Sequence, residues 1–403
     1  MKYIIVLGDG MADQPIEALG GKTPLMAANT PHFDELARKG RSGILVTVPD
    51  DMPAGSEIAN LGVLGYDVHE VFEGRGVLEA ASMGVEIKEG DLGLRCNLIC
   101  IEEEKIKNHS AGHISNAEAA ELIRFLDEKL GSETIRFYPG VSYRHLLVIK
   151  GGKKFLKCTP PHDVPGTPFQ EVMIQPINEE GVETAQLLND LILKSLELLK
   201  DHPVNLKRKE AGKDRANSIW PWSPGYKPQM PTLKDLFGIE KSAVISAVDL
   251  IQGIGVYAGM EVLKVEGATG LYDTNYEGKA QAAIDALKGG ADFVYVHVEA
   301  SDEAGHEGNV DLKVKTIEYL DSRILKPVME AVAELDEPLA IALLPDHPTP
   351  CALRTHTHEP IPFVIYRPGD EPDQVVKYDE ESAKKGGYGT LAGDEFIKAL
   401  LQK

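Results

Sequence analysis

The residue types best suited to chemistry in this chain are aspartates and histidines that occur in short clusters. Asp302 and His306 are separated by Glu-Ala-Gly, and the glycine would let the chain turn sharply so that both side chains point into one site. Asp346 and His347 are adjacent, and adjacent ligands can bind one metal ion or bridge two. Mixed carboxylate and imidazole ligands suit Mn²⁺ or Zn²⁺ better than Ca²⁺, which prefers oxygen alone. These clusters predict a site for divalent metal ions.

Ser56 is the candidate nucleophile. It follows Gly55 and precedes a helical pattern, so its hydroxyl is expected at a helix amino terminus, where N–H groups and the helix dipole favour an incoming phosphate. The alternative interpretation is an ordinary N-cap serine. A cation bound to the hydroxyl would lower its pKa and allow attack on phosphorus. Together with the metal ligands, Ser56 predicts a phosphoryl-transfer enzyme.

The elements that must position these residues alternate between apolar strands and helices. Helices are expected at 30–39, 279–288 and 314–335, and buried strands at 3–7, 242–248, 292–298 and 338–344. This alternation predicts an α/β fold with a doubly wound, mostly parallel sheet. Asp9, Asp302 and Asp346 each follow one of these strands, and ligands gather at the carboxyl edge of such sheets. Isolated caps and solvated loop residues would not share one sheet edge, so we expect the clusters to meet.

The middle of the chain has a different character. At 403 residues the chain is longer than one compact core usually absorbs. The segment 85–204 has its own strands and helices, the latter at 116–129 and 180–199, and is predicted to be an inserted, smaller α+β domain that binds substrate. Segments 1–84 and 205–403 would then form a discontinuous catalytic domain. The proline-rich stretch WPWSPGYKPQMP is expected to be a loop at the junction, either a hinge or a rigid connection.

Arginine and histidine side chains are expected to line the wall of a cleft opposite the metals. Arginine suits phosphate and carboxylate because its planar fork binds two oxygens at once. Taken singly, each of these residues is more often a surface charge or part of an ion pair than a binding residue. The candidates for substrate binding are Arg75, Arg95, His109, His113, Arg144, His145 and His162. Trp220 and Trp222 are interpreted as structural.

Composition narrows the class of protein further. The net charge of −21 argues against nucleic acid as a partner, although a small anionic substrate remains compatible with it. No apolar run approaches the roughly 18 residues that a membrane span requires. The amino terminus is predicted to be a first strand and not a signal peptide. The four cysteines lack a CxxC pair, which indicates free thiols in a reducing compartment, so a cytoplasmic location is expected. The sequence does not indicate an oligomeric state.

Longer motifs resemble a known family across nearly the whole chain. They are GDGMAD, GGKTPLMAANTPHFDELA, MPAGSEIANLGVLGYD, GRGVLEAASMG, RCNL, SDEAGHEGNVDLK, DHPTPC and THTHEPIPF. In order and context they resemble the archaeal-type cofactor-independent phosphoglycerate mutases of the alkaline phosphatase superfamily. The resemblance implies an alkaline-phosphatase-like fold and two divalent metal ions, Mn²⁺ or Zn²⁺ with Mg²⁺ as a further option. It also implies that 2,3-bisphosphoglycerate is not a cofactor.

The resemblance also assigns roles to residues. Asp9, Ser56, Asp346 and His347 would surround one metal ion, and Asp302, His306 and His356 the other. His356 is preferred to His358 because it occupies the family's position before EPIPF. Ser56 would take the phosphoryl group from 3-phosphoglycerate and return it to the 2-hydroxyl of the retained glycerate. The insertion would hold the glycerate carboxylate, and domain closure would protect phosphoserine from water.

Two positions depart from the mutase pattern. Pro348 stands where DHSTP has a serine, and His113 stands where AGRIS has an arginine. The GDGMAD, DHPTP and THT segments also resemble a sub-branch proposed to be homoserine kinases, which remains an alternative on the same scaffold. A phosphomonoester or sulfate hydrolase is less favoured because of the large insertion. A catalytically silent metal-binding module is the least favoured alternative.

Overall fold

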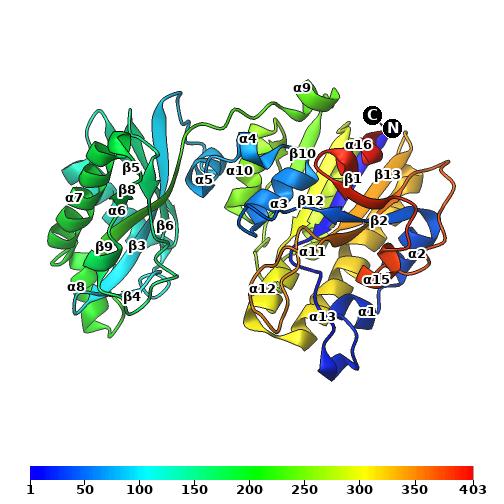
Figure 1. Cartoon of the computed structure of the whole chain (residues 1–403), viewed down its shortest axis with the longest axis horizontal. Coiled ribbons are helices and arrows are strands. Elements are labelled where there is room, and N and C mark those ends of the chain that lie inside the picture. Colours follow the sequence, from blue (N-terminus) through cyan, green and yellow to red (C-terminus); the bar gives the residue numbers. More distant parts are fainter. Residues whose placement is uncertain (403) are drawn as a thin grey trace. The chain divides into compact units, whose positions relative to one another are not determined.

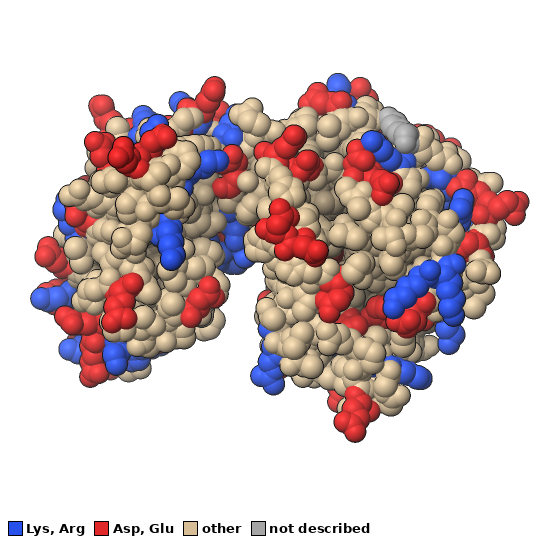
Figure 2. All heavy atoms as spheres, in the orientation of Figure 1, with Lys and Arg blue, Asp and Glu red and all other residues tan. Residues whose placement is uncertain are grey.

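The computed structural model describes residues 1–402, which form two compact units (Figure 1). Unit 1 contains Met1–Phe72 and the chain from Met230 onward, and unit 2 contains Glu73–Gln229. No helix within the described residues is long and apolar enough to cross a membrane. On the face drawn in Figure 2, acidic and basic side chains are scattered in small groups over both units.

Unit 1 is built on an eight-stranded sheet with the order β11-β10-β12-β1-β13-β14-β2-β15. The strands are β1 (Lys2–Gly8), β2 (Arg41–Val46), β10 (Ser242–Ile245), β11 (Glu261–Val262), β12 (Phe293–Val298), β13 (Leu339–Leu344), β14 (Ile361–Tyr366) and β15 (Gly389–Ala392). Strand β1 lies parallel to both β12 and β13, whereas β14 runs antiparallel to β13 and β2. The predicted α/β class with a mostly parallel sheet is confirmed.

Helices cover the sheet of unit 1. They are α1 (Pro24–Ala27), α2 (Pro31–Lys39), α3 (Ser56–Val63), α4 (Val68–Val71), α9 (Leu233–Phe237), α10 (Asp249–Tyr257), α11 (Tyr276–Lys288), α12 (Ala300–Glu307), α13 (Val310–Leu320), α14 (Lys326–Ala331), α15 (Glu380–Ala383) and α16 (Glu395–Leu401). The predicted helix at 314–335 is interrupted by a π-helical turn, Asp321–Leu325, between α13 and α14. The central strands are mostly apolar and buried, as expected for strands that helices cover on both faces.

Unit 2 is an α+β unit around an antiparallel sheet. Its strands are β3 (Asp91–Glu102), β4 (Lys105–Asn108), β5 (Ile135–Val141), β6 (Arg144–Lys150) and β9 (Ser218–Gly225), with a separate pair β7 (Leu156–Lys157) and β8 (Gln175–Pro176). Its helices are α5 (Arg75–Ser82), α6 (Asn116–Leu130), α7 (Val182–Leu199) and α8 (Pro203–Glu210). Leu122, Leu188 and Trp220 belong to its own buried core.

The boundaries of this unit differ from the predicted 85–204. Helix α5 packs on β3, and β9 pairs antiparallel with β3, so both belong to the same compact unit as that strand. The proline-rich stretch predicted as a loop is therefore partly a strand. Pro221 and Pro224 are tolerated because β9 pairs on one side only, with an irregularity at Leu94/Arg95 in its partner. Pairing between distant segments leaves no local signal in composition, which is why the boundaries were misplaced.

Candidate metal and phosphoryl-transfer site

Three carboxylates converge at the carboxyl edge of the sheet in unit 1. Asp9 follows β1, Asp346 follows β13, and Asp302 lies in α12 directly after β12. Because β1 is paired in parallel with both neighbours, the ends of these strands lie together. Asp9 is 1% exposed, Asp302 5% and Asp346 0%. Burying three acidic side chains together is costly unless a cation compensates them.

Asp302 and His306 meet by a route other than the predicted sharp turn. Both lie on α12, four residues apart, so they occupy one face of the helix, and His306 Nε2 is 3.3 Å from Asp302 Oδ2. Gly305 has another purpose: a Cβ atom there would clash with the backbone oxygen of Thr349. The glycine therefore permits close packing of α12 against the loop that follows β13.

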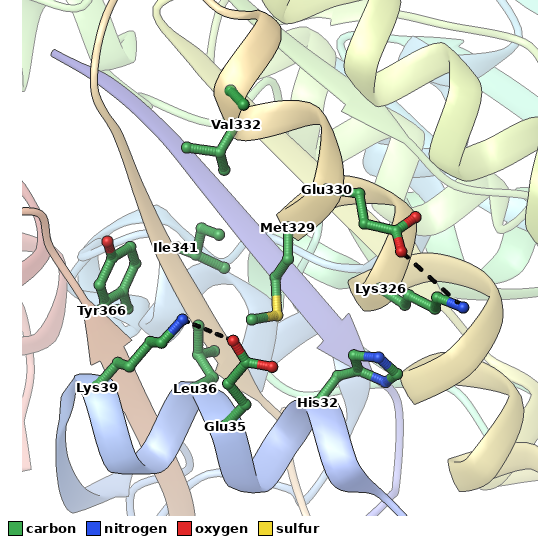
Figure 3. Close-up of a pocket in the computed structure, with 11 residues that line it drawn as sticks. His32, Glu35, Leu36, Lys39, Lys326, Met329, Glu330, Val332, Ile341 and Tyr366 are labelled. Atoms are coloured by element: carbon green, nitrogen blue, oxygen red, sulfur yellow. Dashed lines mark hydrogen bonds and ion pairs between the residues drawn. The ribbon is translucent and has the colours of Figure 1, made fainter.

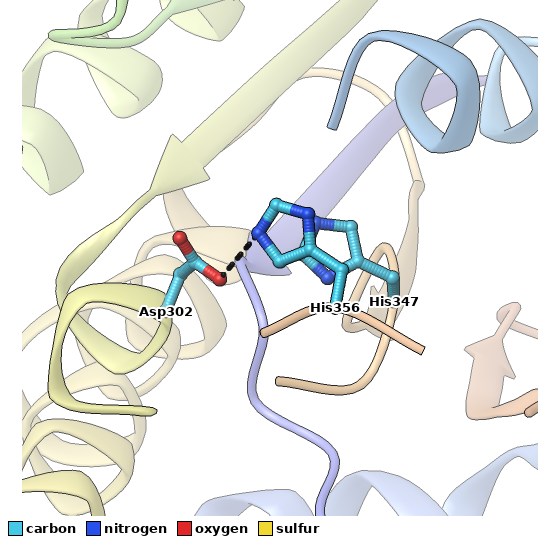
Figure 4. Close-up of side chains that lie close together, drawn as sticks. All are labelled: Asp302, His347 and His356. Carbon is cyan, nitrogen blue, oxygen red and sulfur yellow. Dashed lines mark ion pairs between the residues drawn. The ribbon is translucent and has the colours of Figure 1, made fainter. Parts of the chain in front are cut away.

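His356 completes this group. Its Nε2 lies 3.3 Å from Asp302 Oδ1 and 2.9 Å from His306 Nε2. Figure 4 shows the His356 ring between Asp302 and His347, and the two imidazole centroids of His347 and His356 are 4.0 Å apart. His358, the less favoured member of the histidine pair, lies against Met52 O at 2.9 Å and is outside the group.

Ser56 adjoins the second group of ligands. Its Oγ is 3.1 Å from His347 Nε2, which in turn lies 3.4 Å from Asp9 Oδ1 and 3.5 Å from Asp346 Oδ2. Ser56 is the first residue of α3, whereas Gly55 is the N-cap and makes no side-chain capping bond. The alternative interpretation of Ser56 as an ordinary N-cap is therefore wrong.

The three histidines share one orientation. Each Nδ1 faces a backbone carbonyl: that of Arg354 for His306 at 3.0 Å, of Ala54 for His356 at 3.2 Å and of Pro348 for His347 at 3.3 Å. A donor at Nδ1 fixes the tautomer, so each Nε2 presents a lone pair to the carboxylates, as expected of metal-ligating imidazoles. The Nε2 lone pairs of His306 and His356 face each other, and only a proton or a cation between them resolves that contact.

The protonation of the group shows the same need for positive charge. Burial and the neighbouring charges of Asp346, Asp302 and Glu299 hold the pKa of Asp9 well above its usual value. Burial also acts to raise the pKa of Asp302, but hydrogen bonds with His306 and His356 outweigh it and hold that pKa well below the usual value. Asp9 Oδ1 is buried and has no hydrogen-bond partner among residues 1–402. The donor set therefore fits divalent metal ions.

Several residues of the site were not predicted. His297, in β12, places Nε2 3.0 Å from Asp9 Oδ2 and Nδ1 3.1 Å from Ser246 Oγ, and burial lowers its pKa to about 4. Glu299 offers an oxygen within 4.8 Å of ligand atoms of Asp9 and Asp302. A histidine inside the apolar run DFVYVHV was a signal that could have identified His297. Nothing local marks Glu299.

The residues predicted to bind substrate gather in unit 2. His145 is 2% exposed, and its Nδ1 accepts the Gly140 N–H at 3.0 Å, so the proton lies on Nε2. The Nε2–H of His145 has no hydrogen-bond partner among the described residues. Burial, followed by the charges of Arg144 and Arg95, lowers the pKa of His145 to about 3 and keeps the ring neutral. A buried donor without a partner, in the field of nearby positive charges, is suited to an anion.

Arg95, on the neighbouring strand β3, is held by several contacts. Its guanidinium donates to Glu79 Oε1 at 2.9 Å and to Asn97 Oδ1 at 3.3 Å, and lies 5.0 Å from the Trp222 ring centroid. Burial lowers the pKa of Arg95, and the nearby charges of Arg75 and Arg144 lower it further. Three predicted arginines thus lie in one neighbourhood.

Aromatic contacts join the remaining predicted histidines to this neighbourhood. The ring of His109 lies 5.7 Å from that of Tyr143 and 6.0 Å from that of His162, and His162 lies 5.4 Å from Trp222. His113 is exposed, with a left-handed φ of 52°, and its ring is 6.3 Å from Tyr143. It occupies the margin of the cluster. Trp222 is buried, as expected of a structural residue, but it also supports two of the predicted binding residues.

A cavity of about 420 Å³ lies elsewhere in unit 1 (Figure 3). It lies between α2 and α14 and reaches Ile341 of β13 and Tyr366 of β14. Its charged side chains are paired, Lys39 with Glu35 and Lys326 with Glu330. None of the predicted site residues lines it, so it is separate from the metal site.

The chain is similar to known proteins over part or all of its length. A family described as 2,3-bisphosphoglycerate-independent phosphoglycerate mutase matches residues 37–205. Proteins of that name from Methanosarcina barkeri (strain Fusaro / DSM 804) and Methanosarcina mazei are 51% and 52% identical, over 100% of both chains in each pair.

Two solved structures are similar over the whole chain. A protein from Pyrococcus horikoshii has a TM-score of 0.83 and 29% identity, covering 100% of this chain and 97% of that one. The cofactor-independent phosphoglycerate mutase from Thermoplasma acidophilum has a TM-score of 0.69 and 28% identity, covering 100% and 99%. By full-length identity to its relatives, the chain belongs to the family of 2,3-bisphosphoglycerate-independent phosphoglycerate mutases.

Proposed function

We propose that this protein interconverts 3-phosphoglycerate and 2-phosphoglycerate through a phosphoserine at Ser56, without 2,3-bisphosphoglycerate. The names of its full-length relatives support the reaction. The observation that carries the proposed intermediate is the position of Ser56 Oγ, 3.1 Å from His347 Nε2 at the first residue of α3.

Two divalent cations would be held by the residues of unit 1. Asp9, Ser56, Asp346 and His347 would hold one, and Asp302, His306 and His356 the other. The inward lone pairs of the three histidines and the unpartnered Asp9 Oδ1 support this assignment. Cations bound there would lower the pKa of the serine hydroxyl and neutralise phosphoryl charge.

The chain's own residues would carry the transfer. Ser56 Oγ would lose its proton and form a bond to phosphorus as the bond from phosphorus to the 3-oxygen of the substrate breaks, and that oxygen would take up a proton in turn. The glycerate then presents its 2-hydroxyl, which loses a proton and attacks the phosphoserine, restoring Ser56. The amino end of α3 would favour the phosphoryl group through its N–H groups and dipole.

Glycerate must be retained between the two transfers. We assign its carboxylate to the cluster in unit 2, and the support is the nearby positive charges of Arg75, Arg95 and Arg144 together with the buried Nε2–H of His145. Arg75, His109 and His162 would complete the binding wall, with His113 at its margin.

The metal ions bound in unit 1 are proposed to be Mn²⁺ or Zn²⁺, because the ligands include both oxygen and nitrogen atoms.

The decisive experiment supplies Mn²⁺-loaded protein separately with 3-phosphoglycerate and with homoserine plus ATP, and follows the products by ³¹P NMR. We expect 2-phosphoglycerate without release of inorganic phosphate. Formation of O-phosphohomoserine in the absence of 2-phosphoglycerate would instead support the kinase alternative, and steady release of phosphate would indicate a hydrolase. The relatives described above are named as mutases, so the kinase is not proposed.

A further inference from the structure

Asn60 connects the proposed nucleophile to a proposed metal ligand. It lies on α3 one turn after Ser56 and is fully buried. Its Nδ2 donates to Ser56 O and to Asp346 Oδ2, each at 2.8 Å. Both amide hydrogens are therefore used, one on the helix that begins with the nucleophile and one on the carboxylate after β13.

Tyr295 fixes the orientation of this amide. It lies in β12, is 1% exposed, and its hydroxyl donates to Asn60 Oδ1 at 2.6 Å. The Nδ2 of Asn60 faces two oxygen acceptors, and its Oδ1 faces a hydroxyl donor. Exchanging the two amide atoms would set oxygen against oxygen, so the orientation of the amide is determined. Burial and the charges of Asp346 and Asp9 hold the pKa of Tyr295 well above its usual value, so the phenol keeps the proton that it donates.

The bonds to Asp346 account for most of what that carboxylate can accept. Its Oδ1 accepts the N–H groups of Gly10 at 3.0 Å and of His347 at 2.9 Å, while Oδ2 accepts from Asn60. A carboxylate has about four acceptor positions. One acceptor position of Asp346 therefore remains for a cation. The three donors hold the carboxylate in one orientation and so determine where that position points.

We propose that Asn60 is a positioning residue. Together with Tyr295 it holds Ser56 and Asp346 in the relative positions in which both can bind one metal ion. The inference rests on the proposed two-metal function. Asn60 bonds the backbone oxygen of Ser56 and not its Oγ, so it is not itself a reacting group. It acts by tying α3 to Asp346, just after β13, and to Tyr295 within β12, three elements that are distant in the chain. Partners in the second layer of metal sites typically affect metal affinity or activity by about 10- to 100-fold.

The test is Asn60→Ala, with Mn²⁺ binding as the first readout. In wild type, calorimetry is expected to show two bound ions per chain. In Asn60→Ala we expect one of the two dissociation constants to rise by about 10-fold or more, and kcat to fall by about 10- to 100-fold, while KM changes less than about 3-fold. Tyr295→Phe should move the same quantities in the same direction by less, because the amide loses its anchor but keeps both donors.

Two matched controls separate positioning from general stability. Asn205, in unit 2, is also fully buried, and its amide donates to two backbone carbonyls. Tyr378 is a buried tyrosine of unit 1 whose hydroxyl donates to Pro362 O at 2.9 Å. Asn205→Ala and Tyr378→Phe should lower the melting temperature and leave both Mn²⁺ constants unchanged.

The possible results are distinct. Equal Mn²⁺ constants and equal kcat in wild type and Asn60→Ala would overturn the inference while leaving the proposed function intact. If Asn60→Ala does not fold, an unchanged kcat and unchanged Mn²⁺ constants in folded Tyr295→Phe would overturn it in the same way. A wild-type protein that binds no Mn²⁺ and forms no 2-phosphoglycerate would instead refute the proposed function itself.

Discussion

At the scale of single residues, the site is defined by buried carboxylate and imidazole groups whose ligand atoms lie close to one another. Three buried carboxylates and three histidine Nε2 atoms face one another, and each histidine is anchored from behind by a carbonyl. The sequence predicted Asp9, Asp302 and Asp346 because each follows an apolar strand, whereas the choice of His356 over His358 came from the family resemblance. His297 and Asn60 were not predicted, since their importance depends on contacts between distant segments.

Ser56→Ala should abolish mutase turnover, by on the order of 10⁴-fold or more, because no other hydroxyl is proposed to carry the phosphoryl group. The measurement is the rate of 2-phosphoglycerate formation. Ser115→Ala is the matched control, since Ser115 is a true N-cap, of α6. It should cost about 1 kcal/mol of unfolding free energy and leave turnover unchanged. Retained activity in Ser56→Ala would mean that the nucleophile is another residue.

His145→Phe should raise KM for 3-phosphoglycerate by about 10- to 100-fold, because a hydrogen bond to a charged group contributes about 1.5–3 kcal/mol. His145→Gln, which keeps an N–H donor, should recover part of the affinity. Steady-state kinetics and isothermal titration with glycerate measure both. A His145→Phe protein that is folded and has wild-type KM would remove His145 from the binding wall.

At the scale of elements, the site depends on how α3, α12 and the loop after β13 approach one another. The sequence predicted the central strands well, because apolar runs buried on both faces are visible locally. It missed that Asp302 and His306 lie on a helix, since SDEAGHEG has few apolar residues to show a helical period. It missed β9 because its prolines argue against a strand unless the edge position is known.

Gly305→Ala tests the close approach of α12 to Thr349. The added methyl group would displace the helix, so we expect a loss of about 1–3 kcal/mol of unfolding free energy and weaker Mn²⁺ binding. Gly289→Ala, at the end of α11, is the control: the nearest atom would be 3.1 Å from its Cβ, and metal binding should not change. Denaturant titration and calorimetry provide the two measurements, and unchanged Mn²⁺ binding in Gly305→Ala would contradict the expectation.

Glu380 links α15 to the segment that follows β1 and should make stability depend on pH. Its carboxylate accepts from Thr23 Oγ1 at 2.6 Å and from Asp13 N at 3.2 Å, and burial raises its pKa to about 7. A carboxyl group whose pKa is higher in the folded state than in the unfolded chain stabilises the fold when protonated, so this contribution is lost as pH rises from about 4.5 to about 7.

Glu380→Gln should therefore flatten the dependence of unfolding free energy on pH over that interval. Denaturant unfolding at a series of pH values is the measurement. Glu381→Gln is the neighbouring control, because Glu381 is exposed and paired with Lys384, and should leave the slope as in wild type. An equal slope in wild type and Glu380→Gln would show that Glu380 does not titrate in this range.

At the scale of the whole molecule, two units with separate cores carry different parts of the proposed function. The existence of an inserted unit could be predicted from the change in character along the chain. The limits of this unit at Glu73 and Gln229 could not be predicted from the sequence. They depend on the packing of α5 against β3 and on the pairing of β9 with β3, which are contacts between distant segments.

Removal of metal should affect the two units unequally. Chelation leaves the buried carboxylates of unit 1 without compensation, whereas the basic cluster of unit 2 holds no proposed metal ligand. We expect EDTA to lower the unfolding temperature of unit 1 alone, and Mn²⁺ at 100 times its dissociation constant to restore about 2.7 kcal/mol per ion. Scanning calorimetry with hydrogen exchange can assign each transition to its unit. Equal shifts in both units would contradict this expectation.

The order of the central strands has a consequence for how the protein is made. Tyr3 of β1 lies beside Phe293 of β12 and Ala340 of β13, so neither neighbour exists when β1 leaves the ribosome. At about 5–20 residues per second, β1 waits roughly 15–60 s for β12. Unit 2 is contiguous and can complete its sheet in that interval. The nascent chain therefore carries a folded unit 2 and an unpaired apolar strand at the same time, and β1 is expected to need protection from aggregation during synthesis.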